Sequence, residues 1–153
     1  LQKLRKCDFV PDNDIYWNLY QERHLKELAE ERWIDYAHTT NDMANLLYEE
    51  QKYRGALVHY LEALYIDICL PHYEETRGQC RQLFSSRENI LKYRSCYSLA
   101  AFSACIDELN LNIEQIKEIF MSLVIPQIPF PISRFEAWKI IENKLIDSQT
   151  ILN

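Results

Sequence analysis

The side chains best suited to covalent chemistry lie in one stretch near the middle of the chain. Cys80 follows His72, and Arg77 and Arg81 flank the cysteine. A histidine can accept a thiol proton, and neighbouring guanidinium groups stabilise a thiolate, so this group could act as a nucleophile. No motif of a nucleophilic enzyme surrounds these residues. We therefore expect no catalytic residue and no enzymatic activity.

Two other groups contain side chains that bind metals in proteins. His38 lies one helical turn from Asp35 and Asp42, and Cys69 and His72 have the spacing of a ligand pair. A metal site needs three or four converging ligands that are oriented by further hydrogen bonds. The sequence offers no second pair and no His-x-x-x-His or Glu-x-x-His arrangement. We expect no metal and no cofactor.

A basic strip follows the same stretch. It combines arginines and a lysine with two tyrosines: Arg77, Arg81, Arg87, Lys92, Arg94, Tyr93 and Tyr97. Such a strip could contact nucleic acid. The chain as a whole has a net charge of −6, however, and residues 12–50 hold ten Asp and Glu against three Lys and Arg. Nucleic acid is therefore an unfavourable partner, and an acidic protein surface fits the strip better.

Composition indicates an all-α protein. The 153 residues suit one domain with a real core, and they include only two glycines. Strand proteins need glycine at tight turns, and phosphate-binding loops need it for close backbone approach. Neither a G-x-G nor a G-K-[ST] motif occurs. Sheet folds and nucleotide-binding folds are therefore disfavoured.

The cysteines and the hydropathy pattern bear on location. The chain has five cysteines, which is an odd count, and no C-x-x-C pair. This usage is typical of a reducing compartment. No apolar run has the length of a membrane span, and no signal peptide is visible. We expect a cytoplasmic protein without membrane contact.

The periodicity predicts about six helices in a single domain at 12–153, after a basic, loosely held arm at 1–11 that ends at Pro11. Asp12, Asn13 and Asp14 would cap the first helix. We expect helices at 14–30, 32–50, 52–69, 87–109, 113–124 and 133–149, with 70–86 undecided. Pro71 should end the third helix, because the residue before proline disfavours α geometry. The buried stripe of the first helix is predicted to be Ile15, Leu19, Leu25, Leu28 and Ala29.

Two helix ends have similar sequences. The segment from Leu28 to Trp33 and the segment from Leu47 to Tyr53 each place Glu-Glu before an aromatic residue. The spacing of 19–20 residues is one helix plus one turn, as in an antiparallel helical repeat, although chance similarity of two helix ends is the alternative.

Small and large residues alternate on the packing faces of the second and third predicted helices. Ala44, Ala56 and Ala63 would let the helices approach closely, with Tyr53, Tyr60 and Leu64 beside them. On these residues, segment 40–68 resembles a tetratricopeptide repeat. Asp67 matches the acidic residue at the end of the repeat, but Ile68 replaces its closing proline. A degenerate unit would lie at about 98–126, and the helix at 133–149 would cap the array or contact a second copy.

The resemblance implies a non-enzymatic adaptor or regulatory module that binds a protein or peptide in a groove. Its residues would be His38, Asn41, Asn45, Tyr48 and Glu49. Asn45 stands where chaperone-binding members keep an asparagine, but their accompanying lysine is missing, so a carboxylate clamp is not implied. The alternative is a regulator that binds nucleic acid or an acidic protein through the basic strip. The composition is also similar to that of uncharacterised helical proteins of Gram-positive bacteria and their phages.

Overall fold

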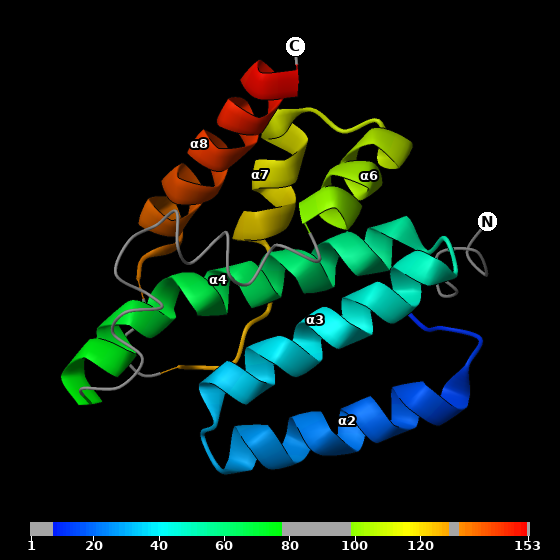
Figure 1. Ribbon diagram of the computed structural model, residues 1–153, viewed down its shortest axis with the longest axis vertical. Coiled ribbons are helices and arrows are strands. Elements are labelled where there is room, and N and C mark those ends of the chain that lie inside the picture. The colour runs from blue at the N-terminus through cyan, green and yellow to red at the C-terminus, as the bar shows by residue number, and fades with distance from the viewer. Residues whose placement is uncertain (1–7, 78–98, 129–131, 153) are drawn as a thin grey trace.

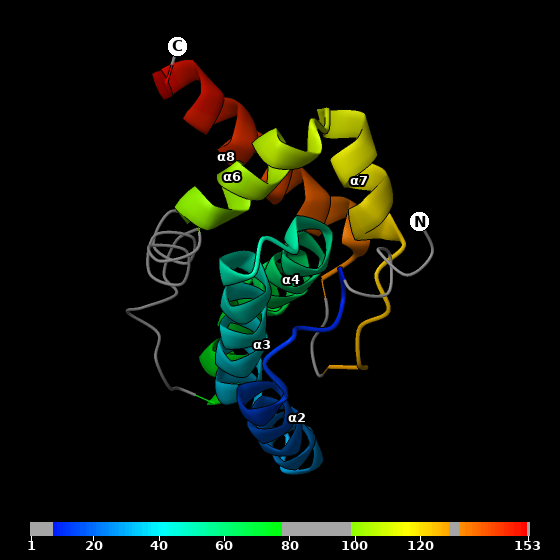
Figure 2. The same cartoon turned by 90° about the vertical axis from the view of Figure 1, so that its right-hand side faces the viewer.

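The structure is a computed structural model that describes residues 8–77, 99–128 and 132–152. Within these ranges it contains six helices and no strand, which confirms the all-α prediction. They are α2 (Asp14–Ala29), α3 (Trp33–Glu49), α4 (Tyr53–Arg77), α6 (Leu99–Leu109), α7 (Ile113–Met121) and α8 (Arg134–Leu152). α2, α3 and α4 run antiparallel side by side, and α6, α7 and α8 pack beyond α4, away from α2 (Figures 1 and 2).

Three turns between helices share one backbone structure. In each turn, a residue with positive φ follows the helix end: Glu31 at 54°, Gln51 at 62° and Asn110 at 54°. The next N–H group then bonds back into the helix, from Arg32 to the Glu27 carbonyl, from Lys52 to Leu47 and from Leu111 to Ile106. This is the Schellman motif, which satisfies carbonyl groups at a helix end. The predicted break near Glu31 is confirmed, and the two similar Glu-Glu segments both form this turn.

The predicted contact between α3 and α4 is also confirmed. Ala44, Ala56 and Tyr60 are essentially inaccessible, and Ala63 is buried. The Tyr60 hydroxyl donates a hydrogen bond of 2.6 Å to Asn45 Oδ1 and so ties the two helices together. The small side chains permit a close approach of the helices, as the sequence pattern indicates.

The predicted buried stripe of α2 is wrong for all of its residues except Leu28. Ile15, Leu19 and Leu25 are exposed at 74%, 55% and 68%. The packing face instead contains Trp17 and Glu27, which are buried, and Tyr20, His24 and Leu28, which are half-buried. Both faces of α2 carry large apolar residues, so the periodicity alone does not identify the one that meets α3.

The expected end of the third helix is corrected. α4 continues through Pro71 to Arg77, because a proline weakens but does not forbid helical backbone, and Ile66, Ile68 and Cys69 are buried just before it. On α8, Trp138, Ile141 and Leu145 are buried, whereas Phe135 is 61% exposed. A capping box of Asn112 and Gln115 begins α7.

The described end of the N-terminal arm is held against the turn between α3 and α4. Glu50 accepts hydrogen bonds from the backbone N–H groups of Asp12 (2.6 Å) and Asn13 (3.2 Å). Lys52 donates to the Val10 carbonyl at 2.8 Å and pairs with Asp12 at 3.1 Å. The expectation of a loosely held arm is therefore wrong for residues 8–11.

The positive φ of Gln51 gives a first prediction. A non-glycine residue in this conformation is strained, so Gln51→Gly should raise the free energy of unfolding by about 0.5–1 kcal/mol. Asn110→Gly should gain less, because asparagine tolerates the left-handed region better. Chemical denaturation of both variants measures the difference, with Gln51→Ala as the control that keeps the strain. A Gln51→Gly protein less stable than wild type would contradict this account of the turn.

A second prediction concerns Gly55, where a substitution should lower the free energy of unfolding. A Cβ atom built at Gly55 overlaps the backbone carbonyl of Asp8. Glycine to alanine within a helix normally stabilises by about 1 kcal/mol, but Gly55→Ala should destabilise the protein by about 1–3 kcal/mol or displace residues 8–12. Thermal unfolding and amide hydrogen exchange across residues 8–13 measure the two effects. An increase in melting temperature with unchanged exchange would refute the contact.

Candidate functional site

The residues of the predicted groove lie together on one face of α3. His38, Asn41, Asn45 and Tyr48 follow a spacing of three and four residues, which aligns them along one side of the helix. His38 and Glu49 are exposed, and the other three are half-buried. The opposite side of α3 is buried. We refer to these five residues as the α3 stripe.

Two side chains of the α3 stripe make contacts with α4 within the protein. Asn45 Oδ1 accepts the Tyr60 hydroxyl hydrogen bond, which leaves its Nδ2 group as the donor toward solvent. The Tyr48 ring meets Tyr53 edge-on, with ring centroids 5.8 Å apart. These contacts fix the orientation of the two side chains, and they also give each of them a structural role.

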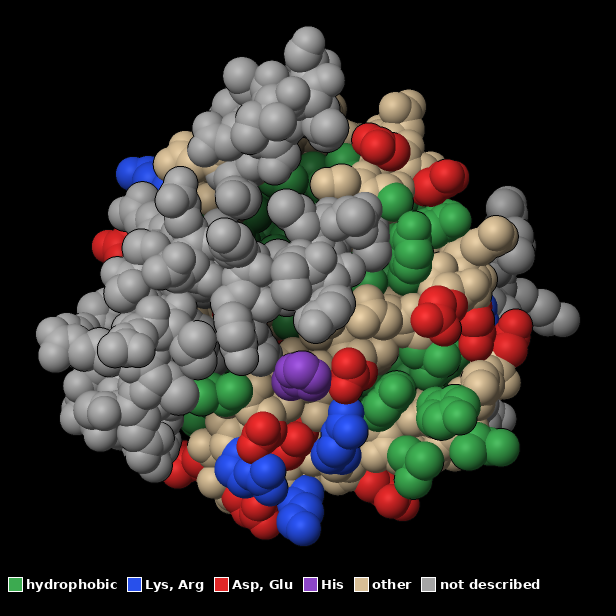
Figure 3. All heavy atoms as spheres, in the orientation of Figure 1, with side chains coloured by type: hydrophobic (Ala, Val, Ile, Leu, Met, Phe, Trp, Pro, Cys, Tyr) green, Lys and Arg blue, Asp and Glu red, His purple; other side chains and the backbone are tan. Residues whose placement is uncertain are grey.

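Charges of both signs surround the α3 stripe. Asp35 pairs with Arg32 at 2.7 Å, and Asp42 pairs with Arg23 at 2.8 Å. Figure 3 shows acidic and basic side chains close together on this side of the molecule, with a histidine among them. The two aspartates next to His38 are thus neutralised by arginines, and among the described residues no group of three or more potential metal ligands comes together.

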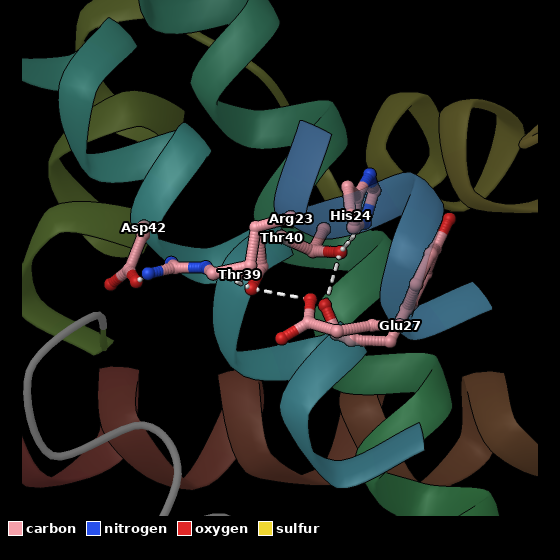
Figure 4. A network of polar contacts seen from close by, with 7 residues as sticks. Arg23, His24, Glu27, Thr39, Thr40 and Asp42 are labelled. Atoms are coloured by element: carbon pink, nitrogen blue, oxygen red, sulfur yellow. Dashed lines mark hydrogen bonds and ion pairs between the residues drawn. The ribbon is translucent and has the colours of Figure 1, made fainter. Parts of the chain in front are cut away.

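A buried polar layer joins α2 to α3 (Figure 4). Arg23 Nε donates to Thr39 Oγ1 at 3.0 Å, and Thr39 donates onward to Glu27 Oε1 at 2.7 Å. Glu27 and Thr39 are almost fully buried. Because burial of an unpaired carboxylate is costly, this chain of bonds is what permits Glu27 to lie in the interface. The layer stabilises the pairing of α2 with α3.

His24 extends this layer. Its Nε2 atom lies 2.8 Å from Thr40 Oγ1, and Thr40 in turn donates to the Tyr36 carbonyl at 2.9 Å. The threonine oxygen therefore accepts a hydrogen from Nε2, which fixes the tautomer of a neutral His24. Its ring stacks on Tyr36 at 3.8 Å. Burial, with smaller contributions from His59 and Arg23, lowers the pKa of His24 to about 4.

An open cleft with a volume of about 520 Å³ lies between α4 and α7 in the described part of the chain. α4 contributes a row at four-residue spacing, and α7 and the segment after it form the other wall. The lining residues are Arg54, Val58, Glu62, Glu118, Ile119, Ser122, Leu123 and Val124. We refer to this feature as the α4–α7 cleft. It contains apolar side chains together with charged groups, as ligand sites commonly do.

Glu62 is the titratable group in the α4–α7 cleft with an altered environment. Burial raises the pKa of its carboxyl to about 7, although the Tyr36 hydroxyl and the charge of Arg134 act in the opposite direction. The Tyr36 hydroxyl lies 3.5 Å from Glu62 Oε2, which is a long hydrogen bond. A half-buried carboxyl with a shifted pKa in a cleft is a candidate functional group. Sequence reasoning missed Glu62; the only signal was its four-residue spacing from Val58 and Arg54.

Arg134 fixes the far wall of the cleft. Its guanidinium group donates to the carbonyls of Phe120 (2.9 Å), Met121 (3.4 Å) and Leu123 (2.6 Å) at the end of α7. It also lies over the rings of Tyr65 and Phe120, at 5.3 and 5.9 Å from their centroids. A cation at the C-terminus of a helix is favoured by the helix dipole. Arg134 thus attaches the start of α8 to α7 and to α4.

The remaining candidates from the sequence give no site in the described part of the chain. Cys69 is buried in α4 and accepts a hydrogen bond from the Ile132 N–H group, and burial raises the pKa of its thiol. Cys80, Arg81, Arg87 and Arg94 lie outside the described residues, as do the side chains of His72 and Arg77. The basic strip therefore receives no structural test.

Comparisons with known proteins do not assign the chain to a family. The chain matches no protein-family model, no curated protein and no solved structure. None of the described helices has the length and apolar character needed to cross a membrane.

The half-buried, neutral His24 makes stability depend on pH. Between pH 6.5 and about 4 the unfolded chain binds a proton at this residue that the folded protein does not, so stability falls as the pH falls. We expect the slope to be smaller in His24→Gln than in wild type by about 1 kcal/mol per pH unit between pH 6 and 5. Denaturant unfolding at several pH values measures both slopes. Equal slopes would show that folding does not lower the pKa of His24.

Proposed function

We propose that the protein is a non-enzymatic module that binds a protein or peptide segment along the α3 stripe. The observation that carries this proposal is the grouping of His38, Asn41, Asn45 and Tyr48 on one face of a helix whose other side is buried. α2 and α4 flank α3, so the binding face would change little when a ligand arrives. The resemblance of 40–68 to a tetratricopeptide repeat implies the same face.

The chemistry of the α3 stripe suits a polar segment with few charges. The amide groups of Asn41 and Asn45 can bond main-chain groups of a peptide, and the rings of His38 and Tyr48 can pack against its side chains. The neighbouring Asp35 and Asp42 are paired with arginines, so the acidic group of the α3 stripe itself is Glu49. Specificity would come from hydrogen bonds and shape.

We also propose that the protein acts as an adaptor or regulatory module and that it is located in the cytoplasm. Cys69 and Cys105 are both free and buried, which is compatible with a reducing compartment.

A contact with a second copy through α8 is a separate prediction. Phe135 is an exposed apolar residue of α8, and the ammonium groups of Lys117 and Lys139 lie 5.4 and 5.9 Å from its ring centroid.

The proposal can be tested without knowledge of the natural partner. Peptides selected against the wild-type protein from a displayed random library should lose at least about tenfold in affinity for His38→Ala and Tyr48→Ala, or about 1.4 kcal/mol. Glu22→Ala, an exposed change on α2, is the matched control and should have no effect. Thermal unfolding checks that Tyr48→Ala remains folded.

Two results would contradict the proposal. Peptides that bind wild type and both α3 stripe variants with the same affinity would exclude this face. Failure to select any peptide above the background of an unrelated helical protein would also count against a peptide-binding role.

A further inference from the structure

We propose that the α4–α7 cleft is a second binding site, which receives a single lysine side chain of a partner protein. The site lies on α4 and α7, away from the α3 stripe, and it does not depend on the function proposed for that stripe. Three features support the assignment: the apolar walls, the position of the carboxyl group, and the mixed charges at the opening.

The walls fit the alkyl part of a lysine. Val58 on α4 faces Ile119 and Leu123 across a space of about 520 Å³. Four methylene groups can lie against such side chains while the ammonium group contacts a polar atom. A volume of this size lies in the lower half of the range that small ligands occupy, so it suits one side chain better than a folded element.

Glu62 supplies the charge that a lysine needs. Its Oε2 atom accepts the long hydrogen bond from the Tyr36 hydroxyl, and its Oε1 atom has no partner among the described residues. A compact ammonium group can be bound by one oxygen, whereas an arginine fork requires both for its bidentate geometry. The engaged Oε2 therefore favours lysine over arginine.

The opening of the cleft selects against a strongly basic segment. Arg54 and Glu118 contribute one positive and one negative side chain to the lining, and Val124 is 95% exposed. The charge of Arg54 would repel additional basic residues. An apolar residue beside the inserted lysine could contact Val124. The expected ligand is thus one lysine next to apolar residues.

Binding at this site should be coupled to the ionisation of Glu62. The charged and titratable groups near its carboxyl are Tyr36 on α3, Arg54 on α4, Glu118 on α7 and Arg134 on α8. Because the carboxyl ionises near pH 7 and an ammonium group binds the ionised form, affinity should rise by about tenfold from pH 6 to pH 8.

The test uses a lysine probe and its uncharged counterpart. Nα-acetyl-lysine N-methylamide is titrated into the whole labelled protein at pH 6 and pH 8 and followed by amide chemical shifts, and the norleucine analogue is titrated in parallel. We expect the lysine probe to shift signals of Val58, Ile119 and Leu123, and to bind about ten times more tightly at pH 8. Glu62→Gln should weaken it by about tenfold at pH 8, with Glu114→Gln, an exposed change on α7, as the control.

Several results would overturn the proposal. These are equal binding of the norleucine analogue, unchanged affinity in Glu62→Gln, no pH dependence, or no shift in the cleft at either pH. Equal affinity for Nα-acetyl-arginine N-methylamide would refute the preference for lysine. His38→Ala should leave the probe's affinity unchanged, so failure of the α3 stripe and failure of the cleft are distinguishable.

Discussion

α4 buries side chains on several of its faces, and the other helices pack against it so that these faces are covered. Of its described side chains from Tyr53 to Cys69, only Arg54 is exposed. α3 contacts it on one side, and α6 and α7 contact it on others. The segment before α8 is held by the Tyr65 hydroxyl, which donates to the Ile132 carbonyl at 2.6 Å. A helix with so little polar surface is not stable in water alone. The two halves of the molecule, α2 and α3 on one side of α4 and α6, α7 and α8 on the other, therefore share one core.

The α4–α7 cleft follows from this arrangement. The row of Arg54, Val58 and Glu62 on α4 is the part that α7 leaves open, and Arg134 fixes the opposite wall through the Leu123 carbonyl. Glu62 is therefore held in a partly apolar place by the packing of three other helices. The α3 stripe has a different origin, because it lies along the side of α3 opposite its buried residues, where Asn45 and Tyr48 contact Tyr60 and Tyr53 of α4. The two candidate surfaces share no residue.

Much of the fold could be predicted because its determinants are local. The helix ends at Glu31 and Asn112, and the small residues Ala44, Ala56 and Ala63, depend on nearby sequence and on helical spacing. The buried face of α2 could not be predicted, because the choice between Trp17 and Ile15 depends on which surface meets His59 and Thr40. The same holds for Glu62, which in sequence is an ordinary helical glutamate; its burial and its nearness to Tyr36 arise only from tertiary packing. The residues of the α3 stripe were predicted from a resemblance, and their grouping on one face is what helical spacing requires.

The claim that α4 joins both halves into one unit is tested most directly by amide hydrogen exchange of Leu61→Ala. Leu61 is fully buried in α4, and its truncation should destabilise the protein by about 2–5 kcal/mol. If the halves share a core, exchange should accelerate to a similar extent in α3 and in α7 and α8. Protection lost in α3 while α7 and α8 keep their wild-type protection would contradict the account and show that the molecule has two independently stable parts.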